Sequence, residues 1–262
     1  MERQRVYGLD NETKIITYLN EKKFSELNDK WKAVIIRMFP FVKENDLIHA
    51  KHFPDYTAKP DMTIQIRHSF VHVSIKTGKN PSVHQESFYS FERFLDKLKV
   101  SKRTQEIIRF FHFGDSRKLK TNGKPICLKE MKEKYSSYFL EASKELDNTK
   151  IIEKVIDRTV IRGTSSKRTG LDYLYYGDLE HGKLLSVEDI YSMVLAYREH
   201  GKSAIHFGGL NYNPSARSTA RRERGYVRIK WPLLSFLYYR SEEDVEKMKE
   251  GLFVSSDVKR DK

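Results

Sequence analysis

The stretch KPDMTIQIRHSFVHVSIKTG, residues 59–78, decides the expected fold of this chain. Apolar and polar side chains alternate over residues 62–68 and again over residues 70–76, which is the period of a strand with one buried face. The His68-Ser69 step between the two segments predicts a tight connection, and Gly78 breaks the second strand. We therefore expect a β-hairpin that brings the two ends of the stretch together.

Two residues of opposite charge, Asp61 and Lys76, mark the open end of this hairpin. They are separated by 14 residues, 62 to 75, so pairing of the strands would bring their side chains near each other. Ser74 lies two residues before Lys76 and points to the same face. A carboxylate can hold Mg²⁺ through its oxygens, and a neighbouring lysine can orient or deprotonate a water. Each residue alone has an ordinary structural explanation, but their joint spacing favours phosphodiester hydrolysis.

The same segment resembles the PD-(D/E)xK nuclease superfamily. Pro60-Asp61 matches the first motif of the superfamily, and Ser-Ile-Lys at 74–76 falls where Asp/Glu-x-Lys is expected. The resemblance covers about residues 59–92, roughly an eighth of the chain. It implies an α/β (α+β) fold, with a small mixed sheet flanked by helices as a restriction-endonuclease-like core. It also implies DNA hydrolysis with Mg²⁺, for which Mn²⁺ can substitute.

Position 74 departs from the superfamily pattern, because serine stands where the second acid is expected. A branch of restriction enzymes in the superfamily has Ser-x-Lys here and a glutamate that has migrated to the next helix. A helix expected over about residues 82–98 offers Glu86 and Glu92. Glu86 is nearer the strand end but points about 150° from the apolar stripe, whereas Glu92 points about 90° from it. We rank Glu86 first as the metal ligand beside Asp61, with Glu92 as an alternate.

Three further residues are candidates for the same site. Many superfamily members carry an acid on an N-terminal helix near the site, and Glu12 lies near the start of a helix expected over residues 11–39. A first-turn acid that complements the helix dipole is an equally good explanation of Glu12. His84 is more ordinarily an inner histidine than a ligand, and Gln85 lies between it and Glu86.

Charge is the strongest global feature of the chain. Its 49 Lys and Arg against 36 Asp and Glu give a formal net charge of +13. Such a surface attracts polyanions, so double-stranded DNA is the expected partner. The single cysteine, Cys127, excludes a disulfide framework and a thiolate zinc site within one chain. No apolar run is long enough to span a membrane, so we expect a cytoplasmic, nucleoid-associated protein without membrane contact.

The densest basic segment follows residues 208–214, which have the composition of a loop. Arginines on a loop suit phosphate contacts, a few could reach guanine edges, and a tyrosine beside them could stack on a base. A solvated charged loop is the alternative. The expected DNA contacts are Arg168, Tyr212, Arg217, Arg221, Arg222, Arg224, Arg228 and Lys230.

The expected organisation is a nuclease-like core over residues 1–112, a polar loop over 113–125 and an extension over 126–262 that could belong to the same domain. Within the extension, residues 127–146 are expected to be helical and residues 159–162 to form a strand.

Taken together, these features predict a metal-dependent DNA endonuclease of the type II restriction kind. Because both strands must be cut, a homodimer is plausible. One alternative is a DNA-binding protein without catalysis, in which Asp61 and Lys76 form a structural pair. Another is an RNA-processing nuclease, which differs in substrate.

Overall fold

The computed structural model describes the chain in separate segments. These are residues 2–55, 58–78, 82–113, 128–164, 169–197, 203–215, 225–237 and 240–250. The chain divides into two compact units, each assembled from stretches that are distant in sequence. Unit 1 comprises residues 1–79, 160–190 and 235–241, and unit 2 comprises residues 80–159, 191–234 and 242–262. This division differs from the expected order of core, loop and extension, and most of the expected loop at 113–125 lies outside the described residues.

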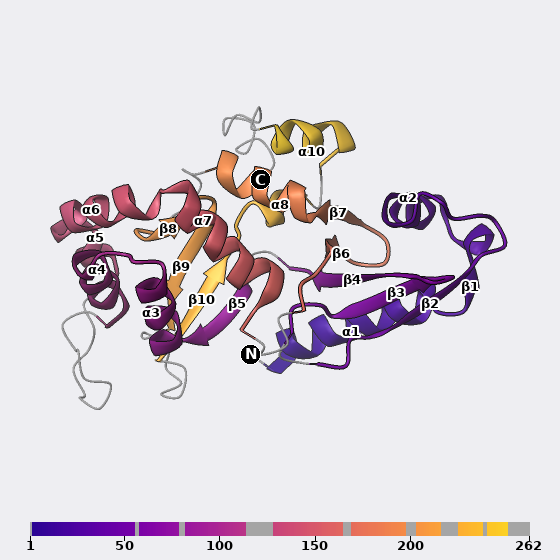
Figure 1. Ribbon diagram of the computed structural model, residues 1–262, viewed down its shortest axis with the longest axis horizontal. Helices are drawn as coiled ribbons and strands as arrows, with labels where there is room; N and C mark the ends of the chain where they lie inside the picture. Colours follow the sequence, from indigo (N-terminus) through magenta and orange to yellow (C-terminus); the bar gives the residue numbers. More distant parts are fainter. Residues whose placement is uncertain are drawn as a thin grey trace. The chain divides into compact units, whose positions relative to one another are not determined.

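Unit 1 contains a six-stranded mixed sheet with the strand order β1-β2-β3-β4-β6-β7 (Figure 1). The strands are β1 Lys22–Lys23, β2 Leu47–His52, β3 Met62–Ile66, β4 Ser69–Lys76, β6 Tyr173–Gly177 and β7 Gly182–Ser186. Neighbouring strands are antiparallel, except that β4 and β6 are parallel. The expected mixed sheet is therefore confirmed, and the β3–β4 hairpin lies at its centre.

The hairpin has the expected strands, but its connection lies one residue earlier than predicted. Ile66 pairs with Ser69, so Arg67 and His68 form the turn. Arg67 adopts a left-handed φ of 55°, and its guanidinium is ion-paired with Asp46 at 2.6 Å. The ion pair with Asp46 therefore fixes the side chain of Arg67, whose backbone conformation is strained.

Two helices, α1 Glu2–Leu19 and α2 Asp29–Met38, pack on one face of this sheet. The buried residues they share with the sheet include Ile15, Leu19, Trp31, Ile35, Ile64, Val73 and Ile75. The single helix expected over 11–39 is wrong, because Glu21 takes a φ of 60° and Asn28 caps a new helix through Trp31 N. The short 3₁₀ turn η1 Phe24–Glu26 lies between the two helices.

Unit 2 contains a four-stranded antiparallel sheet with the order β5-β10-β9-β8. Its strands are β5 Ser82–Ser87, β8 His206–Phe207, β9 Leu210–Pro214 and β10 Tyr226–Lys230. Its helices include α3 Phe88–Lys97, α4 Lys102–Phe113, α5 Leu128–Lys134, α6 Ser136–Leu146 and α7 Thr149–Ile156. Phe91 of α3 and Phe111 of α4 pack against Tyr212 on β9, so these helices cover one face of the sheet.

Three expectations for this region are wrong. Ser82–Ser87 is the strand β5, not the first part of a helix, and α3 begins at Phe88 with Ser87 Oγ accepting from Ser90 N. Residues 208–214 include the strand β9 rather than forming only a loop. The expected strand at 159–162 belongs to a π-helix, η2 Asp157–Arg162, that continues α7.

The remaining helices are α8 Val187–Ala196, α9 Leu234–Leu237 and α10 Glu242–Lys249. Across the described segments, no helix has both the length and the apolar character needed to cross a bilayer. The expected helix over 127–146 is confirmed, with a break at Tyr135 between α5 and α6.

Candidate active site

Asp61 lies at the open end of the β3–β4 hairpin, as the sequence predicts. Its backbone is fixed on both sides, because Asp61 N donates to Val73 O at 2.9 Å and Asp61 O accepts from Phe53 N at 3.0 Å. The residue is therefore an extension of β3 and keeps the side-chain direction that the strand imposes.

One carboxylate oxygen of Asp61 collects three hydrogen bonds from β4. Asp61 Oδ2 accepts from Ser74 Oγ at 2.8 Å, from Ile75 N at 2.6 Å and from Lys76 Nζ at 2.9 Å. Lys76 Nζ also donates to the carbonyl oxygen of Ile75 at 2.9 Å. The structure thus brings Asp61, Ser74 and Lys76 together, with the ammonium group held between two oxygen atoms.

Ser74 occupies the position at which a second acid was expected. Its side chain is buried, with the residue 1% exposed, and its hydroxyl donates to Asp61. A carboxylate in this place would instead put a like charge beside Asp61. Ser74 therefore supports the Asp61 carboxylate rather than adding a charged ligand.

Glu12 on α1 is electrostatically coupled to this group. Burial of its side chain and the negative charge of Asp61 raise the pKa of Glu12 to about 7, although the ammonium of Lys76 opposes the shift. The first-turn interpretation of Glu12 is wrong, because α1 begins at Glu2 and Glu12 lies in the middle of the helix. The preceding residue, Asn11, donates through Nδ2 to Gly177 O at 2.9 Å.

Replacing Glu12 by glutamine should remove a pH dependence of stability. The folded pKa of about 7 lies above the ordinary 4.5, so the favourable contribution is present below pH 4.5 and is lost as pH rises through 7. Allowing for partial solvent exposure, we expect wild type to lose about 1–2 kcal/mol over this range. Urea denaturation in chelator at about pH 5 and about pH 8 measures the loss. The same pH dependence in the variant would contradict the assignment.

Glu86 is not on a helix and forms an ion pair within unit 2. Its side chain is 4% exposed and points from β5 into the unit. Arg158 on η2 donates from Nε to Oε1 at 2.9 Å and from an NH2 nitrogen to Oε2 at 2.6 Å, and His84 Nε2 lies 3.0 Å from Oε1. Burial alone would raise the pKa of Glu86, but the hydrogen bonds from His84 and Arg158 hold it at about 2. His84 is thus a buried histidine that contacts Glu86 rather than a metal ligand, as the ordinary structural explanation expected.

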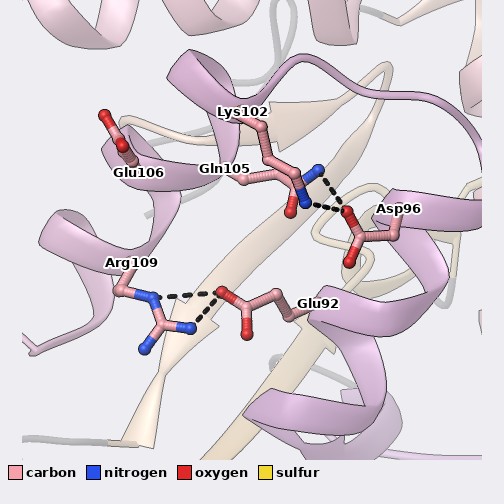
Figure 2. Close-up of a pocket in the computed structure, with 6 residues that line it drawn as sticks. All are labelled: Glu92, Asp96, Lys102, Gln105, Glu106 and Arg109. Carbon is pink, nitrogen blue, oxygen red and sulfur yellow. Dashed lines mark hydrogen bonds and ion pairs between the residues drawn. The ribbon is translucent and has the colours of Figure 1, made fainter.

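Glu92 also has a partner of its own in unit 2. It lies on α3 in a crevice of about 280 Å³ between α3 and α4, where Arg109 hydrogen-bonds to its carboxylate (Figure 2). In the same crevice, Lys102 and Gln105 donate to Asp96, and Glu106 points away from both groups (Figure 2). The crevice is therefore lined by ion pairs between two helices.

Most of the expected DNA contacts lie outside the described residues. Arg168 and the four arginines at 217, 221, 222 and 224 lie outside the described residues. Arg228 and Lys230 lie on β10, both partly exposed.

Tyr212 is buried and cannot stack on a base, so the sequence prediction for this residue is wrong. Tyr212 is 0% exposed, and its ring packs against Phe91, Phe111 and His112. Its hydroxyl lies 2.6 Å from His112 Nδ1. Burial raises the pKa of the Tyr212 hydroxyl well above its ordinary value, so it acts as a neutral hydrogen-bonding group. The tyrosine belongs to the core of unit 2.

Replacing Tyr212 by phenylalanine tests this placement. Loss of the hydroxyl leaves the buried His112 nitrogen without this partner, so we expect a loss of about 1–3 kcal/mol in the free energy of unfolding. DNA affinity, measured by fluorescence anisotropy below the melting transition, should not change. Unchanged stability of the variant would contradict the buried hydrogen bond between Tyr212 and His112.

The comparisons with known proteins address the fold. No protein-family model and no curated protein sequence matches the chain. Among solved structures, the restriction endonuclease MspI, in a crystal structure with its cognate DNA, is similar with a TM-score of 0.54 and 14% sequence identity. The alignment covers 84% of this chain and 87% of that chain. This chain has a restriction-endonuclease-like fold.

Within this restriction-endonuclease-like fold, Asp61, Ser74 and Lys76 meet as the hairpin spacing predicted, and Glu12, an alternate from sequence, is coupled electrostatically to the same group. The signal for Glu12 was its position on the N-terminal helix, and only the packing of α1 against the sheet brings it into reach of Asp61. Sequence reasoning missed Arg158 as the partner of Glu86, because the two residues are 72 positions apart.

Proposed function

We propose that this protein is a divalent-cation-dependent DNA endonuclease of the restriction type. The observation that carries the proposal is the convergence of Asp61, Lys76 and Glu12 at the open end of the hairpin. The similarity in fold to a restriction endonuclease crystallised with DNA, and the net charge of +13, support a polyanionic substrate. We propose duplex DNA as that substrate.

The donor set fits a hard cation such as Mg²⁺ or Mn²⁺. Its oxygen atoms come from the carboxylates of Asp61 and Glu12 and from the carbonyl of Ile75, and oxygen ligands are those that Mg²⁺ prefers. Within the described segments, no group of three or more His, Cys, Asp or Glu side chains could hold a metal, so the set depends on this carbonyl. The raised pKa of Glu12 comes first from burial of its side chain and then from the neighbouring Asp61 carboxylate, which Lys76 only partly compensates.

The residues have separable roles in this proposal. When bound, the cation would polarise the phosphate and lower the pKa of a water. Asp61 and Glu12 would hold it, and Glu86, our first choice from sequence, would not, because its two oxygens are bonded to Arg158. Lys76 would orient the attacking water and offset the charge that develops on the phosphate. Ser74 would fix the direction of the Asp61 carboxylate.

Cleavage of a supercoiled plasmid tests the function. Wild type should produce discrete fragments with Mg²⁺ or Mn²⁺ and none with excess chelator, and Lys76→Ala should abolish cutting. Lys23→Ala is the matched control, because it removes an exposed lysine from the edge strand β1 of the same sheet.

Intact plasmid under every condition, with a gel shift retained, would indicate a DNA-binding protein without catalysis. Metal-dependent cleavage of RNA alone would indicate an RNA-processing nuclease. The homodimer stays a prediction, and sedimentation with and without duplex DNA tests it.

A further inference from the structure

One face of the four-stranded sheet of unit 2 carries mainly polar side chains, of which Asn211 is buried and the others are exposed or partly exposed. On the other face, residues such as Glu86, Tyr212 and Val227 point inward and are buried. Because side chains alternate along a strand, the residues between them point to the opposite side. Gln85, one of these, is exposed, and Arg228 is partly exposed.

Three polar residues form a row across this second face. Arg228 on β10 is directly opposite Gln85 on β5 and directly opposite Asn213 on β9, so the three side chains share one side of the sheet. Arg228 Nε donates to Gln85 Oε1 at 3.2 Å. Asn213 Nδ2 donates to Asn211 O at 3.3 Å, along its own strand. We call Gln85, Arg228 and Asn213 the polar row.

The polar row contains the side-chain types that read bases. Guanidinium groups contact guanine edges, and carboxamides contact adenine edges, in the major groove, which admits a β-ribbon. Two strand spacings amount to about 10 Å, so the row would span about three base-pair steps of about 3.4 Å. The chemistry and the spacing are therefore both compatible with direct readout.

The charge around the row favours a polyanion. Tyr226 and Lys230 lie two residues on either side of Arg228 and, by alternation, on the same face, with Tyr226 40% exposed. Glu86 is the one acidic residue of β5, β9 and β10, and its carboxylate is buried on the inner face. This face thus presents two cations and no carboxylate from its three strands. Such a face repels a basic partner and attracts a polyanion such as DNA.

We propose that the polar row reads base edges in the major groove of duplex DNA, with Arg228 contacting guanine. Gln85 is a positioning residue that orients the guanidinium, and Asn213 contacts the neighbouring base pair. The proposal rests on the proposed function, because it names the surface by which the nuclease would choose its sequence.

Binding in chelator separates sequence choice from cutting. The full-length protein is incubated with duplexes that carry a randomised centre, and bound duplexes are sequenced. Wild type should enrich sequences with a fixed guanine, and Arg228→Lys should reduce the discrimination at that position by about tenfold or more. Because lysine keeps the charge, affinity for unselected duplex at the same salt concentration should be unchanged. Arg93→Lys, an exposed arginine on α3 of the same unit, is the matched control.

Gln85→Ala provides a second variant if Arg228→Lys does not fold. It should weaken the preference at the same base position, whereas a purely structural role would change the melting temperature without changing base preference. Unaltered base preference in folded variants, or absence of any preference in wild type, would overturn the proposal, as would tighter binding to single strands. If Arg228→Lys loses base preference but wild type does not cut plasmid, the proposed role of the polar row stands and the proposed nuclease activity is rejected.

Discussion

Replacing Asp61 by asparagine should reduce phosphodiester cleavage by about a thousandfold or more. The substitution keeps the shape of the side chain but removes its charge, so the oxygen that now binds Lys76 Nζ could no longer attract a divalent cation strongly. It also removes the negative charge that, in addition to burial, raises the pKa of Glu12. DNA affinity should not fall, because the variant removes repulsion between a carboxylate and a phosphate.

Single-turnover cleavage and duplex binding, measured side by side, check this expectation. Asp55→Asn is the matched control, since Asp55 precedes β3 in the same unit but is not among the residues that contact Lys76 Nζ. Cleavage by Asp61→Asn at more than about a tenth of the wild-type rate would place the catalytic centre elsewhere. Loss of binding together with cleavage would indicate that Asp61 supports the fold rather than the reaction.

Replacing Arg158 by methionine should lower the free energy of unfolding by about 3–5 kcal/mol. The Glu86 side chain is 4% exposed, and Arg158 supplies two of its hydrogen bonds. The variant therefore leaves a buried carboxylate that keeps its contact with His84 but has no cationic guanidinium beside it. The cost of burying a charge without its partner is larger than the value of the pair itself. Guanidinium denaturation at neutral pH measures the loss.

Two comparisons make this result specific. Arg103→Met removes an exposed ion pair with Glu141, whose side chains are 49% and 47% exposed, and should cost less than about 1 kcal/mol. Adding Glu86→Gln to Arg158→Met should restore part of the loss. Equal losses for Arg158→Met and Arg103→Met would show that the Glu86 pair does not stabilise unit 2.

The wild-type pair also predicts an acid transition. The folded pKa of Glu86, about 2, lies below the ordinary 4.5, so its contribution to stability is present above pH 4.5 and is lost as pH falls through 2. In Glu86→Gln this part of the acid dependence should be absent.

The β3–β4 hairpin could be predicted from sequence because its signals are local. Alternating burial, a turn and a break all lie within residues 59–78, and pairing within a hairpin needs no distant partner. The catalytic candidates at its open end followed directly from the strand lengths. The fold class followed from the resemblance of this same segment to the PD-(D/E)xK superfamily.

The strand β5 could not be predicted, because its partner is far away in sequence. The segment SVHQES has a polar composition and a proline before it, which resembles a helix start. It forms a strand because it pairs with β10, where Glu86 lies opposite Val227. Tertiary pairing overrides local propensity here, and the error carried over to the orientation of Glu86.

The choice between Glu12 and Glu86 likewise needed the packing of helices on sheets. Sequence distance to Lys76 favours Glu86, whereas Glu12 is 64 residues away from it (76 minus 12). Only the structure shows that Arg158 is bound to Glu86 and that the charge of Asp61 acts on Glu12.

The parallel pairing of β4 with β6 has a consequence for the timing of assembly. Lys76 is aligned with Tyr176 in this pairing. The edge of β4 can therefore pair with β6 only after another 100 residues (176 minus 76) have been synthesised. At about 5–20 residues per second, a ribosome takes roughly 5–20 seconds to make that interval. During this time the nascent hairpin has an uncovered edge at β4. The Asp61 and Ile75 oxygens around Lys76 Nζ therefore lie next to a completed sheet only when about two thirds of the polypeptide has been synthesised.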